Sequence, residues 1–287
     1  MLILGHRGTI EATVAQNSLR ACQQAITSAN GFETDACASK DGDIFLIHEA
    51  KYADAAKGVE YAMAEHLDPA SAALLGNRRM EQLSADEVRH LRLQDGQPLP
   101  TLREAVELVG SHRGKLLNIE LKARDVVGPV LKLVQSSLHS GIIKPEALLL
   151  SSFNHFALDI VRREAPDLKR GAIFIGPDQP TAKLFPWHPE DPATYTALTP
   201  EALRAPILEQ IQPDYFVMPE DILNEATAAM IEARYPKAKL IAWVFTEKGS
   251  FDVQDLLARL KRLEPTNKVA AMIVDNPGAF RKVWQQR

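Results

Sequence analysis

The stretch ALLLSSFNHFALDIVRREAPDLKRGAIFIG (147–176) contains a complete strand–helix–strand unit. Its first segment, ALLLSSF (147–153), and its last, GAIFIG (171–176), are apolar runs without strict polar alternation. Such runs are typical of parallel strands that are covered on both faces. Between them, FNHFALDIVRREAP (153–166) has helical spacing and stops at a proline. Because a helix that joins two parallel strands is the repeating unit of α/β folds, the stretch predicts an α/β protein.

The same alternation extends along the chain in both directions. Further apolar runs typical of strands are LILG (2–5), FETDACA (32–38), IFLIH (44–48), LLNIELK (116–122), YFVMP (215–219), LIAWVFT (240–246) and AAMIVD (270–275). Helical patterns with a cap residue or a proline stop are NSLRACQQAITSA (17–29), TLREAVELVG (101–110), LNEATAAMIEARYP (223–236) and SFDVQDLLARLKRLEP (250–265). About eight strand–helix repeats predict a TIM-type (β/α)8 barrel, and a doubly wound open sheet is the alternative.

Three segments depart from the regular repeat. The tight-turn signal SKDGD (39–43) separates two predicted strands and indicates a β-hairpin. A polar, alanine-rich hairpin or loop segment is inserted near residues 49–100, and residues 177–213 are rich in proline. Long loops of barrels usually lie over the mouth of the active site. We expect a single catalytic barrel domain over 1–287, with a small insertion at about 49–80.

The composition argues against several classes of protein. The formal net charge of −4 gives no indication of a nucleic-acid partner. No run of about 18 apolar residues predicts a membrane span. The two cysteines, Cys22 and Cys37, are too few for a disulfide framework, and the chain opens without a signal-peptide pattern. We therefore expect a cytoplasmic protein that acts on a small molecule, while its oligomeric state stays open.

Polar side chains gather where the predicted strands end. In a barrel, the carboxyl ends of the strands form the active-site face. His6 and Arg7 follow the first strand, and His48 ends the hairpin strand. Glu33 and Asp35 lie on the second strand. Because residues i and i+2 on a strand face the same side, these two carboxylates are expected to project together.

Glu120 and Lys122 form a second pair with the same spacing. Carboxylates that converge on one small space repel each other unless a positive charge lies among them. Oxygen ligands without cysteine favour Mg²⁺ or Ca²⁺ over Zn²⁺. Histidines such as His6 and His48 can exchange protons near neutral pH, and Arg7 with Lys122 provides positive charge for a phosphate. The set predicts hydrolysis of a phosphate ester.

These ordered motifs resemble those of the glycerophosphodiester phosphodiesterases. The matching segments are GHRG (5–8), GFETDACASKDGDIFLIHE (31–49), LPTLREAVELV (99–109), NIELK (118–122), LLSSFNHFALDIVRREAPDL (149–168) and IVDNP (273–277). The resemblance implies a TIM-type barrel and metal-dependent hydrolysis of a glycerophosphodiester to glycerol phosphate and an alcohol. It also implies a place in lipid and glycerol metabolism and a small-molecule phosphodiester as substrate.

The resemblance implies roles for residues at the matching positions. His6 and His48 resemble the acid/base pair of the family. Glu33, Asp35 and Glu120 resemble the ligands of one divalent cation, Mg²⁺ or Ca²⁺. The positions that resemble substrate contacts are Arg7, Lys122, Trp243 and Phe245. In a related mechanism the neighbouring glycerol hydroxyl attacks phosphorus and gives a cyclic intermediate, and direct attack by water is the alternative.

The sequence departs from the family pattern at several positions. Gln16 stands where the family usually has a glutamate, so metal affinity or substrate choice can differ. Glu49 replaces a usual aspartate, and Phe245 lies where tryptophan is common. The segment 49–80 lacks clear family markers, which leaves open a lysophospholipase D or another phosphodiesterase with a bulkier substrate. A catalytically silent binding barrel is a further alternative.

Several further residues have a purely structural interpretation beside a functional one. Asn17 is either a helix cap alone or also a residue of the site. Trp243 and Phe245 are either core residues or a pocket wall. The other histidines are expected at the surface or in loops, and they are His66, His90, His112, His139, His155 and His188.

Overall fold

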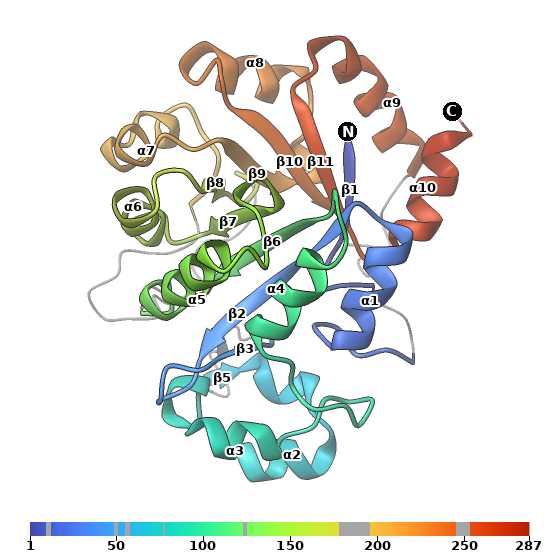
Figure 1. Ribbon diagram of the computed structural model, residues 1–287. Helices are drawn as coiled ribbons and strands as arrows, with labels where there is room; N and C mark the ends of the chain where they lie inside the picture. Colours follow the sequence, from blue (N-terminus) through green and yellow to red (C-terminus); the bar gives the residue numbers. More distant parts are fainter. Residues whose placement is uncertain are drawn as a thin grey trace.

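A computed structural model describes residues 1–9, 13–48, 51–54, 58–76, 78–122, 125–177, 196–244 and 253–286, with the backbone alone at 51–54 and 58–62. Its centre is a closed barrel of parallel strands (Figure 1). In their order around the barrel these are β1 (Leu2–Gly5), β11 (Val269–Val274), β10 (Lys239–Val244), β9 (Tyr215–Pro219), β8 (Lys169–Ile173), β7 (Leu148–Ser152), β6 (Leu116–Leu121) and β2 (Gly31–Ala38). The pairing of Gly5 with Phe32 joins β1 to β2 and closes the ring. The predicted TIM-type barrel is confirmed, and the open sheet is excluded.

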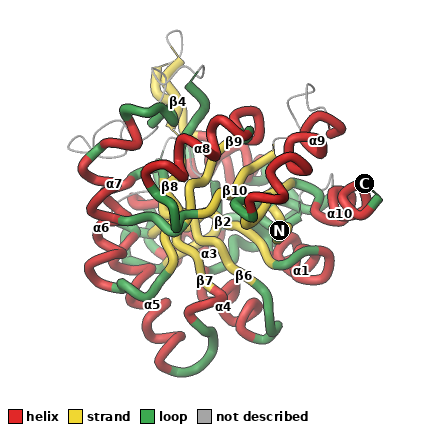
Figure 2. Tube along the Cα trace, turned by 90° about the horizontal axis from the view of Figure 1, so that it is seen from above, coloured by secondary structure: helices red, strands yellow, loops and turns green. Residues whose placement is uncertain are grey.

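Helices surround the barrel, as Figures 1 and 2 show. They are α1 (Leu19–Ser28), α4 (Leu102–Gly110), α5 (Val127–His139), α6 (His155–Glu164), α7 (Pro206–Ile211), α8 (Glu225–Arg234), α9 (Val253–Leu263) and α10 (Pro277–Gln285). Short 3₁₀ turns in and around the barrel are η1 (Ala62–His66), η2 (Met80–Gln82), η3 (Pro145–Ala147), η5 (Ala202–Arg204), η6 (Glu220–Ile222) and η8 (Glu264–Thr266). No helix in the described ranges has the length and apolarity needed to cross a bilayer.

Side-chain caps begin the helices that the sequence indicates. The Ser18 hydroxyl accepts a hydrogen bond from the backbone N–H of Ala21 at the start of α1. Thr101 and Glu104 form a capping box at the start of α4. Caps of this kind satisfy backbone donors that have no partner within the helix. They fix where each helix begins and therefore how long the loop over the barrel mouth is.

Two apolar layers hold the barrel together. The larger layer lies between the strands and the helices, and Phe32, Leu150 and Phe216 are examples of its buried side chains. The smaller layer fills the barrel interior and includes Leu4 and Ile241. Because both faces of the strands are buried, their sequences lack polar alternation, as expected for parallel strands. The acidic side chains on these strands, Glu33, Asp35 and Glu120, are residues of the site.

A hairpin and an inserted segment extend one side of the barrel. Strand β3 (Ile44–Leu46) runs antiparallel to β2, which confirms the hairpin predicted from SKDGD. The insertion contains β4 (Lys51–Asp54), β5 (Gly58–Tyr61), α2 (Pro69–Leu75) and α3 (Ala85–His90). Helices α2 and α3 lie below the barrel in Figure 1, and the insertion from Met63 onward has an apolar cluster of its own, which is continuous with Phe45 of β3. That the whole chain is one domain stays a prediction.

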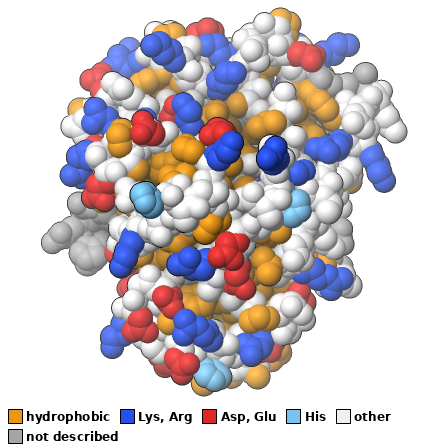
Figure 3. Space-filling view, in the orientation of Figure 1, with side chains coloured by type: hydrophobic (Ala, Val, Ile, Leu, Met, Phe, Trp, Pro, Cys, Tyr) orange, Lys and Arg blue, Asp and Glu red, His pale blue; other side chains and the backbone are white. Residues whose placement is uncertain are grey.

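The outer face of the insertion carries acidic and basic side chains side by side (Figure 3). Arg78 pairs with Glu87, and Arg89 pairs with Asp43 of the β2–β3 turn. Exposed pairs of this kind contribute little to stability. Predictions for Glu49, His188 and Phe245, and for residues 178–195 of the proline-rich segment, fall outside the described residues.

Candidate active site

The first loop of the chain places His6 and Arg7 at the barrel mouth. Arg7 and Gly8 both have left-handed backbone angles, with φ of 52° and 87°. A Cβ at Gly8 would lie 2.5 Å from the backbone of Ala21 in α1, so only glycine fits there. The carbonyl of Arg7 accepts a hydrogen bond of 2.8 Å from the N–H of Asn17. The loop is therefore folded tightly against α1, and this holds the histidine and the arginine in place.

Three carboxylates converge beside this loop. Glu33 and Asp35 lie on β2, and Glu120 lies opposite Asp35 on the neighbouring strand β6. One oxygen atom from each of the three lies within 4.8 Å of the others. Glu33 and Asp35 are buried, with exposed fractions of 4% and 0%. The structure thus brings together the three residues that the sequence predicts as metal ligands.

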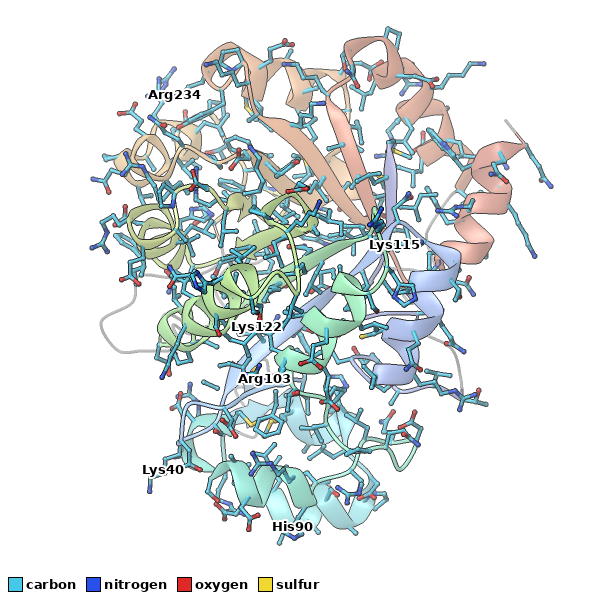
Figure 4. All side chains as sticks on the ribbon, in the orientation of Figure 1. Lys40, His90, Arg103, Lys115, Lys122 and Arg234 are labelled. Carbon is cyan, nitrogen blue, oxygen red and sulfur yellow. The ribbon has the colours of Figure 1, made fainter. Side chains whose placement is uncertain are left out.

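Two cations and one amide hold the central carboxylate, Asp35. The ammonium of Lys122 lies 2.8 Å from Asp35 Oδ1 and 2.7 Å from Glu120 Oε1. The guanidinium Nε of Arg7 lies 3.0 Å from Asp35 Oδ2, and Asn17 Nδ2 donates to the same oxygen over 2.9 Å. Asn17 is therefore a residue of the site, while Ser18 caps the helix. Figure 4 labels Lys122 within this central part of the molecule.

The electrostatics of the cluster favour a further positive charge. Burial, followed by the charges of Asp35 and Glu120, raises the pKa of Glu33 well above its usual value. Burial also acts to raise the pKa of Asp35, but Lys122 and Arg7 outweigh it and hold that pKa well below the usual value. Glu33 Oε1 is buried and has no hydrogen-bond partner in the described part of the chain. An orphaned carboxylate oxygen among crowded acids fits a divalent cation that prefers oxygen ligands.

His6 is held by a carboxylate at the end of the last strand. Its Nδ1 lies 2.7 Å from Oδ1 of Asp275, and both side chains are largely buried. Because a carboxylate accepts, Nδ1 carries the proton and the neutral ring presents Nε2 as an acceptor. Burial and the charge of Arg7 lower the pKa of His6, and Asp275 acts against them.

His48 lies two residues beyond β3, close to the two cations of the cluster. Burial, Lys122 and Arg7 all lower its pKa, which lies well below the usual value. Its ring meets the ring of His66 edge to face, with the centroids 5.6 Å apart. His48 therefore belongs to the same polar cluster as the carboxylates.

Trp243 lies at the end of β10, inside the barrel. It belongs to the interior apolar layer, is 9% exposed, and meets Phe153 edge to face with centroids 5.9 Å apart. Trp243 is thus a residue of the interior core, near the end of the barrel where the mouth lies.

Asp275 and His66 had no site role in the sequence interpretation, and Gln16 was noted there only as a departure from the family pattern. Asp275 ends a predicted strand, so the rule that finds the other strand-end residues also finds it. Gln16 and His66 are linked by a hydrogen bond of 3.0 Å. His66, which the sequence placed at the surface or in a loop, is half-buried at the end of η1 and meets both Gln16 and His48.

His155 also differs from the expectation of a surface residue. It is buried at the start of α6, where Nε2 lies 3.1 Å from the carbonyl of Ile173 and the ring packs on Phe174. Burial lowers the pKa of His155 to about 4. His90, His112 and His139 are exposed, as expected.

Comparisons with known proteins give a consistent result. Residues 6–279 match the model of the glycerophosphoryl diester phosphodiesterase family. A glycerophosphodiester phosphodiesterase of Caldanaerobacter subterraneus subsp. tengcongensis is 28% identical over 190 residues, which cover 65% of this chain and 70% of the relative.

Solved structures of low sequence identity share the fold. A glycerophosphodiester phosphodiesterase from Parabacteroides distasonis matches with a TM-score of 0.67 at 17% identity, and the match covers 100% of this chain and 97% of that one. An Oleispira antarctica phosphodiesterase, solved in complex with its product sn-glycerol-3-phosphate, matches with a TM-score of 0.67 at 20% identity, covering 99% and 97%. A glycerophosphodiester phosphodiesterase from Thermotoga maritima matches with a TM-score of 0.59 at 22% identity, covering 98% and 97%.

Proposed function

The chain belongs to the glycerophosphoryl diester phosphodiesterase family and is a phosphoric diester hydrolase, and we propose that it converts glycerophosphodiesters to glycerol phosphate and an alcohol. The observation that carries this proposal is the buried cluster of Glu33, Asp35 and Glu120, with two cations beside it. Buried acidic groups that only maintain the fold are expected to have each oxygen paired with a cation or a hydrogen-bond donor. Here one carboxylate oxygen keeps no partner in the described part of the chain.

Glu33, Asp35 and Glu120 would hold one divalent cation, Mg²⁺ or Ca²⁺. When bound, such an ion supplies positive charge that stabilises the negative charge of the reacting phosphoryl group. Arg7 and Lys122 lie at the same cluster and have donors that match phosphoryl oxygens. We assign them to the phosphate, with Asp35 as the anchor that positions both cations.

His6 is the general base of this proposal. Its Nδ1–H donates to Asp275, so the ring is oriented and its Nε2 can accept a proton. The same contact stabilises the imidazolium that forms when the proton is taken up. Asp275 thus positions His6 and does not itself exchange the proton.

His48 is the general acid, which protonates the leaving alkoxide. In the free protein Lys122 and Arg7 contribute to its low pKa. A bound phosphodiester brings negative charge to these cations and thereby raises the pKa of His48 towards neutrality. Substrate binding would then prepare His48 to donate its proton.

Trp243 borders the mouth from inside the barrel, and we assign it to the wall of the substrate pocket. Phe245, predicted for the same wall, lies outside the described residues. From the sequence, the insertion and the proline-rich segment 177–213 are expected to leave room for a bulkier alcohol group. A lysophospholipase D with a bulkier substrate therefore stays the second candidate. Cytoplasmic location and a role in lipid metabolism stay predictions.

A panel of diesters tests the proposal. We expect release of glycerol phosphate from glycerophosphocholine with Mg²⁺ or Ca²⁺. Release of choline from lysophosphatidylcholine at a higher kcat/KM would favour the second candidate instead. A diester without the neighbouring hydroxyl separates the two routes, because only direct attack by water cleaves it. No turnover of any member of the panel would overturn the proposal in favour of a silent barrel.

A further inference from the structure

Gln16 and His66 connect the insertion to the mouth of the barrel. Gln16 lies in the loop between β1 and α1, and His66 ends the turn η1 of the insertion. Arg7 donates a hydrogen bond to Gln16 Oε1, and Gln16 Nε2 lies 3.0 Å from His66 Nδ1. The His66 ring also meets the ring of His48. The insertion thus contributes a side chain to the group of residues that surrounds the carboxylates.

The chemistry of the partners fixes the direction of each hydrogen bond. A guanidinium has donors only, so the amide oxygen of Gln16 must face Arg7. The amide NH₂ then faces His66 and can only donate, so Nδ1 of His66 accepts. In a neutral imidazole the proton must consequently be on Nε2. Burial, together with the charge of Arg7, lowers the pKa of His66 to about 4, which keeps the ring neutral at pH 7.

The Nε2–H of His66 is therefore a donor in need of an acceptor. The atom is shielded from solvent and has no hydrogen-bond partner in the part of the chain that the structure describes. A shielded donor without an acceptor costs about 1–3 kcal/mol, and a bound ligand can relieve that cost. Arg7 exerts the largest charge effect on His66, and Lys122 adds to it while the carboxylate of Asp35 opposes it. Because the guanidinium and the ammonium attract an anion to the same place, an anionic oxygen is the acceptor that this position favours.

We propose that the Nε2–H of His66 donates a hydrogen bond to an anionic phosphoryl oxygen of the bound substrate, and that Gln16 holds His66 in this donor form. This inference deepens the proposed function and rests on it for the identity of the ligand. It also gives a physical meaning to Gln16. A glutamate at this position accepts from both neighbours, so it requires a proton on His66 Nδ1 and leaves Nε2 of the neutral ring as an acceptor.

The proton position can be measured without any assay of activity. In long-range ¹H–¹⁵N spectra of the protein with labelled histidine, protonated and unprotonated ring nitrogens resonate far apart. His66 should show a bare Nδ1 and a protonated Nε2, and the Gln16→Glu variant should show a proton on Nδ1. The signals of His66 are identified by their loss in His66→Asn. A proton on Nδ1 of the unchanged protein, or identical His66 spectra before and after Gln16→Glu, overturns the proposal.

Inorganic phosphate serves as the probe of the donor. The titration is run with Mg²⁺ present, followed by NMR and calorimetry. The Nε2–H signal of His66 should shift as phosphate binds, and glycerol alone should leave it unchanged. His66→Asn keeps an acceptor for Gln16 but has no donor at the position of Nε2. It should bind phosphate about tenfold more weakly.

His90→Asn is the matched control, since His90 is exposed at the end of α3 in the same insertion (Figure 4). It should bind phosphate as the unchanged protein does, and thermal unfolding shows whether each variant is folded. Equal phosphate affinity in His66→Asn and the unchanged protein, or a fixed Nε2–H signal at saturating phosphate, refutes the donor role. These readouts are independent of turnover. If the protein cleaves no diester of the panel, the proposed function is refuted. The spectra and the phosphate titration still decide the role of His66.

Discussion

Replacing Asp275 by asparagine tests how the structure makes His6 a base. The carboxylate lies 2.7 Å from His6 Nδ1, and the exposed fractions of the two side chains are 12% for His6 and 7% for Asp275. Asparagine has nearly the same shape but can present its NH₂ group to the ring. Nδ1 would then accept and the proton would move to Nε2, where the base must be bare. The change therefore alters the tautomer with little change in packing.

The expected loss follows from what the base contributes. General acid–base catalysis typically contributes about 10²- to 10⁴-fold in rate. In a triad where a buried carboxylate orients the catalytic histidine, this replacement costs about 10⁴-fold. We expect kcat/KM for glycerophosphocholine to fall by about 10²- to 10⁴-fold in Asp275→Asn, which corresponds to about 3–5 kcal/mol of transition-state stabilisation. Affinity for Mg²⁺ should stay unchanged, because Asp275 is not a member of the carboxylate cluster.

Asp214→Asn is a suitable control for this experiment. Asp214 immediately precedes β9, pairs with Lys169 and Arg170, and so lies at the end of the barrel opposite the mouth. It should keep the activity of the unchanged protein. If Asp275→Asn also stays within about threefold of that activity, the carboxylate does not set the tautomer of a catalytic base, and the assignment of His6 is wrong.

Three further changes have defined outcomes. His48→Ala should lower kcat by at least about 10²-fold in steady-state assays, and a near-normal rate would remove His48 from the mechanism. Glu33→Gln should weaken Mg²⁺ binding in calorimetry because it removes the charge of one ligand, and an unchanged affinity would count against the site. Burial lowers the pKa of His155 from 6.5 to about 4, so the folded state binds its proton less readily than the unfolded state does. The free energy of unfolding should therefore fall as the pH drops from about 6.5 to about 4. This loss should be larger in the unchanged protein than in His155→Gln, by up to about 3 kcal/mol. If chemical denaturation shows the same loss of unfolding free energy in both proteins, His155 is not buried in its neutral form.

The strands and most of the site could be predicted because their signals are local. Apolar runs marked each strand of the barrel, and spacing along β2 indicated that Glu33 and Asp35 project together. Helix α5 lacked such signals, since its cap residue Val126 makes no side-chain hydrogen bond and glycine and proline lie in its first turn. Helix α7 has only six residues and also begins without a side-chain cap.

The contribution of the insertion to the site could not be predicted. The placement of His66 depends on how Met63 of η1 and the following Leu67 pack into the apolar cluster of the insertion. No periodicity in the sequence encodes that contact. Lys122 was predicted as a phosphate contact, and the structure shows in addition that it bridges Asp35 and Glu120. Such pairing depends on which strands are neighbours, and the sequence alone does not state it.

Diester hydrolysis by this protein should require a divalent cation at the three carboxylates. Release of glycerol phosphate from glycerophosphocholine tests it most directly when one preparation is assayed with Mg²⁺, after treatment with EDTA, and after excess Mg²⁺ is restored. Activity should be lost with EDTA and should return with the cation. Full turnover in EDTA, by a protein free of bound metal, would contradict this requirement.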